Sequence, residues 1–284
     1  MLHFVYAMHK VLICCLLTAA LYSIPVHGQD TNITIDVDTL IELVLPSVLK
    51  PRVIGGYVTT NEKLGGYLMS LRYEKKFICG GTLLHDLIVL TAAHCFRNRP
   101  KTNEWIAAGG ISKLSEVGIE REFRDIFRSA EFRENDTHMD VALVRLKSPM
   151  RGKGIGKLSL CSTNLKPGLE LVVSGWGMTN VNVSGANNLL HSAVVPFIDK
   201  ERCRTAYHPS SLILTDSMLC AGSLGKKDAC TFDSGGPLVY KKQVCGIVSF
   251  GIGCASVRYP GVYTDINYVK PFIEKSMKEL LANL

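Results

Sequence analysis

The stretch Asp228-Ala-Cys-Thr-Phe-Asp-Ser-Gly-Gly-Pro237 says most about this chain of 284 residues. It places Ser234 directly after an aspartate and directly before two glycines. A serine hydroxyl is a weak nucleophile near neutral pH, so a catalytic serine needs an imidazole to take its proton and a carboxylate to orient that imidazole. The stretch therefore directs attention to the histidines and aspartates elsewhere in the chain.

Five further motifs accompany this stretch, in the order Arg52-Val-Ile-Gly-Gly56, Thr91-Ala-Ala-His94-Cys95, Asp140-Val-Ala-Leu-Val144, Ser174-Gly-Trp-Gly177 and, after the serine, Pro260-Gly-Val-Tyr-Thr264. Together they resemble the activation, histidine, aspartate and structural motifs of trypsin-like serine proteases. The resemblance extends over nearly the whole chain from Arg52 onward. The order His, Asp, Ser is that of the chymotrypsin fold and differs from that of subtilisin or the α/β-hydrolases.

This resemblance implies a catalytic triad of His94, Asp140 and Ser234, in a cleft between two six-stranded antiparallel barrels. It thereby implies a serine endopeptidase, whose acyl transfer needs no metal and no organic cofactor. Taken singly, a histidine beside a cysteine is more often a packed or surface residue, and an aspartate before an apolar strand is more often a turn residue. The assignment depends on the three motifs occurring together and in order.

One residue departs from the family pattern. The family has GDSGGP at the nucleophile, whereas this chain has Phe232 in place of the first glycine. The resemblance implies that the backbone N–H groups of Phe232 and Ser234 form the oxyanion hole. A bulky residue disfavours the backbone conformation that this loop asks of a glycine. A weakly active or non-catalytic homologue, acting as a binding or regulatory module, is therefore the alternative hypothesis.

The resemblance also implies a specificity pocket. Asp228 matches the carboxylate at the base of the trypsin pocket, and Gly251 and Gly261 match the glycines that keep its walls open. A buried carboxylate selects a cationic side chain, so we expect cleavage after Arg or Lys. Ala229 lacks the hydroxyl that helps to bind a lysine ammonium, which favours arginine. The strand that pairs with the substrate backbone matches Ser249, Phe250 and Gly251.

The N-terminal region indicates processing of a secreted protein. Residues 11–24 form an apolar run behind Lys10, too short for a comfortable membrane span, and the small-residue sequence Val26-His27-Gly28 follows. We expect a signal peptide at residues 1–28, with an uncleaved anchor helix as the alternative. Residues 29–52 are then a propeptide, and residues 53–284 the protease domain, with the barrel boundary near 155–168.

The activation motif implies a zymogen. Cleavage after Arg52, by another trypsin-like protease or by the enzyme itself, frees the α-amino group of Val53. In the family this ammonium folds inward and pairs with the aspartate before the nucleophile, here Asp233. A charge of this kind is costly to bury without a partner, so the new ion pair can shape the site.

Cysteine usage fits an oxidising compartment. The chain has 10 cysteines, and discounting Cys14 and Cys15 in the signal segment leaves an even number. The resemblance pairs Cys79 with Cys95, Cys203 with Cys220 and Cys230 with Cys254. Leu171 and Tyr240 stand where a further family disulfide has its cysteines. By elimination we expect Cys161 to pair with Cys245, the alternative being two free thiols.

The apolar pattern predicts an all-β protein with a C-terminal helix. Short runs rich in apolar and β-branched residues lie at 66–73, 77–84, 87–92, 141–146, 169–174, 237–240 and 244–249. Such a pattern is typical of barrels or sandwiches. Apolar residues recur at helical spacing over 267–284, which predicts an amphipathic helix with Pro271 in its first turn.

The net charge and the N-glycosylation sequons bear on which molecules this protein binds and how it is modified. The net charge is +7, and the basic residues are scattered except for the group Arg145, Lys147, Arg151, Lys153 and Lys157. We interpret this basic group as a solvated loop, with a polyanion-binding site as the alternative. We expect a monomer that cleaves proteins or peptides and meets protein inhibitors, with neither nucleic acid nor membrane as a partner. Sequons permit N-glycosylation at Asn32, Asn135 and Asn182.

Metal binding finds little support. No spacing of His85, His138, His191 or His208 with a cysteine suggests a zinc site, and we interpret these histidines as solvated or hydrogen-bonded. Gly110 stands where the calcium loop of some trypsins has its first glutamate. The sequence keeps Glu116, Glu120 and Glu122 nearby, so it neither supports nor excludes calcium binding.

Overall fold

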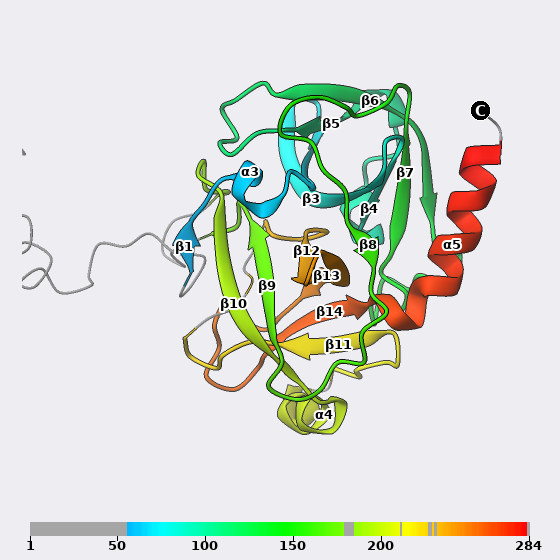
Figure 1. Ribbon diagram of the computed structural model, residues 1–284. Helices are drawn as coiled ribbons and strands as arrows, with labels where there is room; N and C mark the ends of the chain where they lie inside the picture. The colour runs from blue at the N-terminus through cyan, green and yellow to red at the C-terminus, as the bar shows by residue number, and fades with distance from the viewer. Residues whose placement is uncertain (1–55, 179–184, 211, 227–228, 230–231, 283–284) are drawn as a thin grey trace, which may run out of the picture. The chain divides into compact units, whose positions relative to one another are not determined.

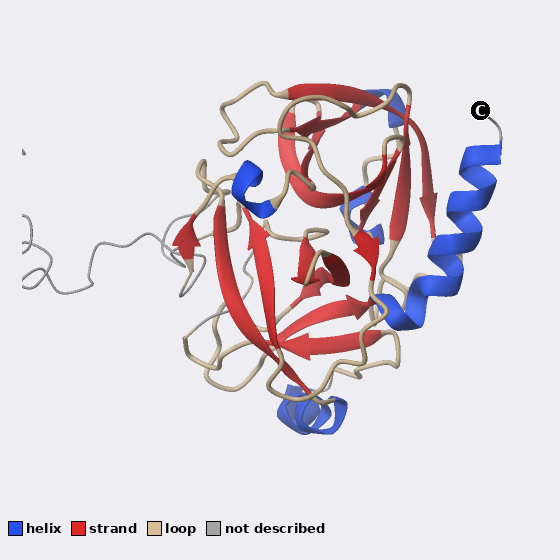
Figure 2. Ribbon diagram, in the orientation of Figure 1, coloured by secondary structure: helices blue, strands red, loops and turns tan. Residues whose placement is uncertain are grey.

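The computed structural model describes residues 56–282, except 179–184, 211, 227–228 and 230–231 (Figure 1). Strands hold more of this part of the chain than helices do, loops and turns connect them, and the α-helices lie at its edges (Figure 2). No described helix is both long enough and apolar enough to cross a membrane.

The first barrel is closed and contains β2 to β7. Its strands are β2 (Leu68–Tyr73), β3 (Lys76–His85), β4 (Ile88–Thr91), β5 (Trp105–Gly109), β6 (Ile119–Arg128) and β7 (Ala142–Leu146). They follow the order β2-β3-β4-β7-β6-β5, and β5 returns to pair with β2. Aromatic rings fill its interior, where Trp105 stacks on Phe123 at 5.6 Å between ring centroids. Burial of these large rings supplies much of the hydrophobic stabilisation of this barrel.

The second barrel is built by the C-terminal half of the described chain. Its strands are β9 (Glu170–Gly175), β10 (His191–Ile198), β11 (Met218–Ala221), β12 (Pro237–Tyr240), β13 (Gln243–Phe250) and β14 (Gly261–Asp265). Their order is β10-β11-β14-β13-β12-β9, and β9 also pairs with β10. Two short strands extend this sheet: β1 (Tyr57–Val58) along β10 and β8 (Ser159–Leu160) along β13. The predicted fold of two six-stranded antiparallel barrels is confirmed.

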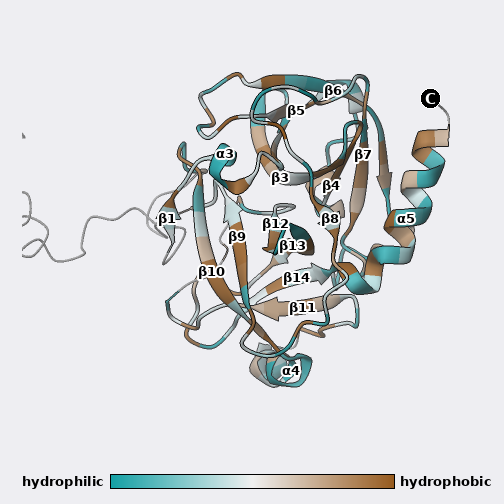
Figure 3. Cartoon of the chain, in the orientation of Figure 1, coloured by the Kyte–Doolittle hydropathy of each residue, from teal (hydrophilic) through white to brown (hydrophobic). Residues whose placement is uncertain are grey.

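Three α-helices are described: α3 (Asn61–Leu64), α4 (Lys200–Tyr207) and α5 (Ile266–Ala282). Polar and apolar residues alternate along α5 (Figure 3). Its apolar side buries Val269 and Ile273, and Phe272 stacks on Phe127 of β6 at 6.0 Å. The predicted terminal helix is confirmed. The expected position of Pro271 in the first turn is wrong: it is the sixth residue of a helix that begins at Ile266 and lies in the second turn.

The seven strands expected from apolar runs all form, with ends shifted by at most two residues. The apolar runs did not predict every strand, and β6 is one that they missed. Its sequence, Ile-Glu-Arg-Glu-Phe-Arg-Asp-Ile-Phe-Arg, has a mainly exposed face and several charges. A strand with so much solvent-facing surface gives a weak apolar signal. Backbone pairing with β5 and β7 creates this strand.

Three disulfides are present among the described residues, and each matches an expected pair. They join Cys79 to Cys95, Cys161 to Cys245 and Cys203 to Cys220. The Cys161–Cys245 bridge excludes the alternative of two free thiols at these positions. Cys254 is also disulfide-bonded, while its expected partner, Cys230, lies outside the described residues.

Candidate active site

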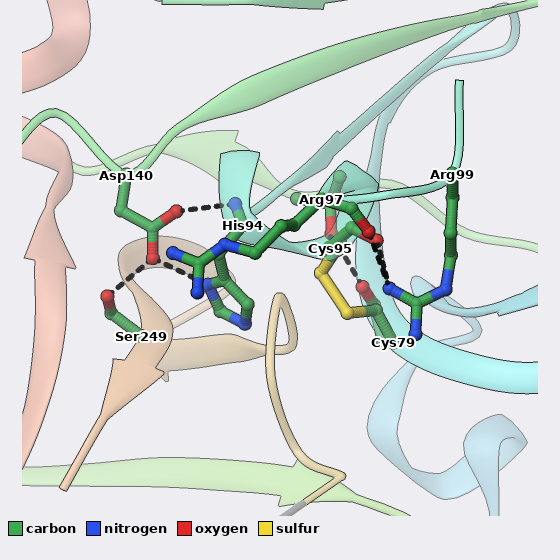
Figure 4. Close-up of a disulfide and its surroundings, with 9 residues drawn as sticks. Cys79, His94, Cys95, Arg97, Arg99, Asp140 and Ser249 are labelled. Carbon is green, nitrogen blue, oxygen red and sulfur yellow. Dashed lines mark hydrogen bonds and ion pairs between the residues drawn. A yellow bond between two sulfur atoms is a disulfide. The ribbon is translucent and has the colours of Figure 1, made fainter. Parts of the chain in front are cut away.

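His94 and Asp140 form a close pair at the edge of the first barrel. His94 lies in the 3₁₀ turn η1 (Ala93–Phe96) after β4, and Asp140 precedes β7. The backbone N–H of His94 donates to Asp140 Oδ1 at 2.9 Å, and Nδ1 lies 2.7 Å from Oδ2 (Figure 4). A carboxylate can only accept, so Nδ1 carries the hydrogen and Nε2 is the nitrogen able to take a proton.

The second barrel holds the same carboxylate. The Ser249 hydroxyl donates to Asp140 Oδ2 at 2.5 Å, and the Thr264 hydroxyl donates to the Asp140 carbonyl at 2.8 Å. Burial favours a raised pKa for the Asp140 carboxyl, but the His94 imidazole, the Ser249 hydroxyl and the His94 backbone N–H outweigh it and hold this pKa below its ordinary value. The site therefore keeps a fully buried, ionised carboxylate behind the imidazole.

The residue before Asp140 has a strained backbone that the second barrel supports. Met139 has φ +53°, and its N–H donates to the Ser217 hydroxyl at 3.0 Å. Ser217 Oγ also lies within 3.1 Å of His138 Nδ1 and 3.0 Å of Thr215 Oγ1. His138 is thus hydrogen-bonded, as interpreted from the sequence. This cluster had no sequence signal, because its hydroxyls follow no recognisable spacing. Thr264 ends the Pro260-Gly-Val-Tyr-Thr264 motif, but the motif did not predict its contact with Asp140.

The loop that carries Ser234 lies between the two barrels and is hydrogen-bonded to both. The Ser234 carbonyl accepts from the Gly80 N–H of β3 at 2.8 Å, and the Gly235 N–H donates to Val248 of β13 at 2.9 Å. Gly235 has φ +76°, and a side chain there would overlap Thr91 Oγ1 and approach the Gly80 carbonyl to 2.6 Å. Only glycine fits this position, which explains one of the two glycines after Ser234.

Asp233 is buried behind this loop. The Gly177 N–H donates to Asp233 Oδ1 at 2.8 Å. A Cβ atom at either Gly175 or Gly177 would overlap the carboxylate oxygens of Asp233. The two glycines of the Ser174-Gly-Trp-Gly177 motif are thus needed so that the chain can approach this carboxylate.

A cavity of about 250 Å³ opens beside Ser234. Ala229, Gly251 and Gly261 line it, and Ser249 and Phe250 form part of its wall. Gly251 and Gly261 face each other across this wall: a Cβ atom at Gly251 would lie 4.0 Å from the Gly261 Cα, within ordinary van der Waals contact. Ser249 and Phe250 also line a second cavity, of about 680 Å³, which includes His94.

Phe232 keeps a backbone conformation that favours glycine. The φ angle of Phe232 is +77°, almost the same as the +76° of Gly235 in the same loop. A non-glycine residue in the left-handed region costs about 1–3 kcal/mol and persists only where its surroundings impose it. The side chain of Phe232 is half-buried.

Several predicted residues lie outside the described part of the chain. These are Arg52, Val53, Asp228, Asn32 and Asn182. Asn135 is described and exposed, and Thr137 of its sequon lines the second cavity. A glycan on Asn135 would therefore stand at the rim of that cavity.

Potential metal ligands in the described residues are engaged in other bonds. Cys79, His94 and Cys95 lie close together, but the two sulfurs form a disulfide and His94 is paired with Asp140. Of the candidate calcium glutamates, Glu116 accepts from two backbone N–H groups. Glu120 pairs with Arg72 at 3.1 Å, and Glu122 with Lys147 at 2.5 Å.

The basic group expected on the surface is largely neutralised. Arg145 is buried, at 3% exposure, because it lies within β7. Lys147 pairs with Glu122, while Arg151 and Lys157 both pair with Asp86. A polyanion would have to compete with these carboxylates, so this group gives little support to a polyanion-binding site.

Two barrels, a His94–Asp140 pair and a Ser249 that bonds this pair and also lines the Ser234 cavity are the arrangement of a serine protease of the chymotrypsin fold. Residues 53–273 match the family model described as Trypsin, and the chain belongs to the trypsin family. It is 60% identical over 256 residues to Seminase from Drosophila melanogaster, covering 90% of this chain and 93% of that protein. It is therefore a serine endopeptidase by family.

Similarity to a second relative and to a solved structure also supports membership of the trypsin family. The chain is 35% identical over 261 residues to the Vitellin-degrading protease of Bombyx mori, covering 88% of this chain and 96% of that protein. It also matches the solved structure of neuropsin, a serine protease expressed in the limbic system of mouse brain, with a TM-score of 0.70 and 31% identity. That match covers 78% of this chain and 98% of neuropsin.

Replacing Ser249 by alanine should destabilise the protein in a pH-dependent way. Hydrogen bonds to charged groups contribute about 1.5–3 kcal/mol, so the free energy of unfolding at neutral pH should fall by about this amount. Because the folded pKa of Asp140 is lowered, the contribution of its ionised form is present above the ordinary carboxyl pKa and is lost as pH falls through the lowered value. Urea unfolding at several pH values should show the deficit shrinking in acid.

Ser192→Ala is the matched control. Its buried hydroxyl lies 2.6 Å from the Ser174 hydroxyl and touches no charge. Its deficit should be about 0.5–1.5 kcal/mol and constant with pH. A pH-independent deficit for Ser249→Ala would show that its hydroxyl does not support the ionised Asp140.

Proposed function

We propose that this endopeptidase is a secreted zymogen, activated after Arg52, that cleaves protein substrates after arginine and less readily after lysine. One observation supports it most: Ser249, which donates to the Asp140 carboxylate paired with His94, also lines a cavity whose wall combines Ser234 with Gly251 and Gly261. A cavity of this kind accepts a long side chain next to the reacting hydroxyl.

The residues have complementary roles in this reaction. Ser234 Oγ attacks the scissile carbonyl while His94 Nε2 takes the hydroxyl proton. Asp140 stabilises the imidazolium that forms, and the imidazolium then gives the proton to the leaving amine. Water, deprotonated by the same imidazole, releases the acyl group and restores the serine. The N–H groups of Phe232 and Ser234 would bind the oxyanion of each tetrahedral intermediate.

Specificity for arginine rests on Asp228 and Ala229. The resemblance puts the Asp228 carboxylate at the pocket base, where a cationic side chain removes the cost of an unpaired buried charge. A guanidinium can engage a carboxylate in bidentate fashion, whereas a lysine ammonium gains from an additional hydroxyl at position 229.

Arginyl and lysyl peptides that are otherwise identical should therefore differ in kcat/KM, with arginine favoured. The Asp228→Ser variant should lose most turnover of both, and Ala229→Ser should narrow the difference between them. Fluorogenic peptide libraries measure all three. A preference for Phe or Ala before the scissile bond would show that the pocket assignment is wrong.

Secretion and zymogen activation fit the same proposal. The three described disulfides are typical of an oxidising compartment. Asp233 is buried at 1% exposure next to the Ser234 loop, so an ammonium reaching it would act directly on that loop. The residues before 53 supply the signal and the propeptide.

The Arg52→Gln variant should be folded and secreted but inert, because the Val53 ammonium is never released. Activity should appear in the wild type when a trypsin-like protease cleaves after Arg52, as N-terminal sequencing of the product can verify. Full peptide hydrolysis by uncleaved Arg52→Gln would exclude this mechanism.

Phe232 decides between an active enzyme and a non-catalytic homologue. Loss of one oxyanion donor costs about a hundred- to thousandfold in turnover. The glycine-like φ of Phe232 supports retention of its N–H in the site, at the cost of backbone strain. The ring then crowds the leaving-group side, so we expect activity on small substrates and weak binding of large folded inhibitors.

Comparison of the activated wild type with Phe232→Gly tests this expectation. A small arginyl ester should be cleaved by both, within about tenfold, because both keep two oxyanion donors. A folded protein inhibitor should bind the glycine variant more tightly. Activity found only in Phe232→Gly would favour the non-catalytic alternative, and equal rates with equal inhibition would show that Phe232 has no functional effect.

A further inference from the structure

The second cavity carries an excess of positive charge beside His94. Its volume is about 680 Å³, and its lining includes Lys76, Arg97 and Arg99 against one acidic residue, Glu74. Lys76 begins β3, whereas the two arginines follow the turn that carries His94. Cations from two separate segments thus meet at one opening.

Two of these cations have no acidic partner in the described part of the chain. Arg97 Nε lies 3.3 Å from Glu134 Oε2. Arg99 instead donates from Nη1 to the carbonyls of Cys95 and Arg97, at 3.2 and 3.1 Å, which hold the guanidinium without neutralising it. Lys76 is exposed. Neither Lys76 nor Arg99 forms an ion pair with a described residue.

The position of Arg99 indicates which part of a substrate it meets. Figure 4 shows Arg99 and the Cys79–Cys95 disulfide on the opposite side of His94 from Ser249. Ser249 belongs to the strand assigned to residues before the scissile bond. Ser249 and Phe250 line one part of this cavity, and the part lined by Arg99 is then left for the leaving group. An extended chain advances about 3.3–3.6 Å per residue, so roughly the first two or three residues of the leaving group reach that part.

We propose that Lys76 and Arg99 select substrates with an acidic side chain in the first residues after the scissile bond. This inference rests on the proposed peptidase function and adds a second specificity determinant to it. The planar guanidinium of Arg99 keeps donors that its two carbonyl contacts do not use, and such donors match a carboxylate. Because the cavity is open to solvent, the selection is modest and weakens with salt.

Binding without turnover tests the inference. The full chain with Ser234→Ala is cleaved after Arg52 by immobilised trypsin, which is then removed. Three fluorescein-labelled peptides share an arginine before the scissile bond and carry Glu, Gln or Lys at the two positions after it. Fluorescence anisotropy should give the lowest Kd for the Glu peptide, about three- to tenfold below the Gln peptide at low salt. The difference should vanish at about 0.5 M NaCl.

Variants assign the preference to the two side chains. Lys76→Gln and Arg99→Gln should each reduce it, and Arg99→Lys, which keeps the charge, should retain part of it. Lys75→Gln is the matched control: it removes the same charge one residue away, from a side chain that does not line the cavity. The Arg99 variants lose contacts with backbone carbonyls and could disturb the turn after His94. Lys76 forms no ion pair with a described residue, so Lys76→Gln should keep the fold and tests the inference independently.

Equal Kd values for the Glu and Gln peptides, including no measurable binding of either, would overturn the inference. So would a preference that survives both Gln variants, or one that Lys75→Gln removes equally. Turnover by the intact serine enzyme is measured separately. Failure to cleave any arginyl peptide would contradict the proposed function, whereas cleavage of all three peptides at one rate would contradict only the acidic preference.

Discussion

The buried carboxylate of Asp140 is the constraint on which the rest of the structure depends. An ionised carboxylate without solvent is costly unless several donors compensate it. Here the donors come from both barrels: His94 from the first, and Ser249 from the second. A shift of either barrel would leave a buried charge partly unpaired, so this charge fixes how the barrels meet. The same contacts orient the imidazole, so stability and catalysis depend on one group.

The second constraint on the structure is that the backbone of the Ser234 loop must approach the backbones of neighbouring segments closely. The nucleophile loop touches β3 through Gly80 and β13 through Gly235, and no side chain fits at Gly235. Behind it, Asp233 is enclosed by Gly175 and Gly177. The glycines of two motifs far apart in sequence therefore serve one purpose, which is to let three segments pack around the residue that carries the reacting hydroxyl.

Much of this could be predicted from the sequence because short motifs encode it. The barrels, the Cys79–Cys95 and Cys203–Cys220 disulfides and the meeting of His94 with Asp140 follow from the resemblance that the motifs carry, and the Cys161–Cys245 disulfide followed by elimination. The apolar runs located strands with one strongly buried face but missed β6, whose stability comes from its neighbours. The contacts of Thr264 and Ser217 were not predicted, although Thr264 ends a recognised motif, because a hydroxyl acquires its partner only when the fold brings it to Asp140 or Met139.

Charge was the least predictable property. The cluster that was prominent in the sequence, around Arg151 and Lys157, is neutralised by Asp86, which lies more than sixty residues away. Of the cations that line the second cavity, Lys76 and Arg99 form no ion pair with a described residue, and they are 23 residues apart in the sequence, where they give no pattern. Sequence clustering reports local charge density, whereas binding depends on charges left uncompensated after folding.

Phe232 and these cations together shape the leaving-group side. Hydrogen bonds fix the backbone on both flanks of Ser234, with Gly236 donating to Asp233 and Gly80 to Ser234. Phe232 directly precedes this fixed segment, and its left-handed φ puts backbone strain on a residue where the family uses glycine. Under the proposed function, its ring would restrict bulky partners near the scissile bond, and Lys76 and Arg99 would attract acidic side chains beyond it. Steric exclusion and charge thus act in succession along the same part of a substrate, and this narrows specificity without altering the His94–Asp140 pair.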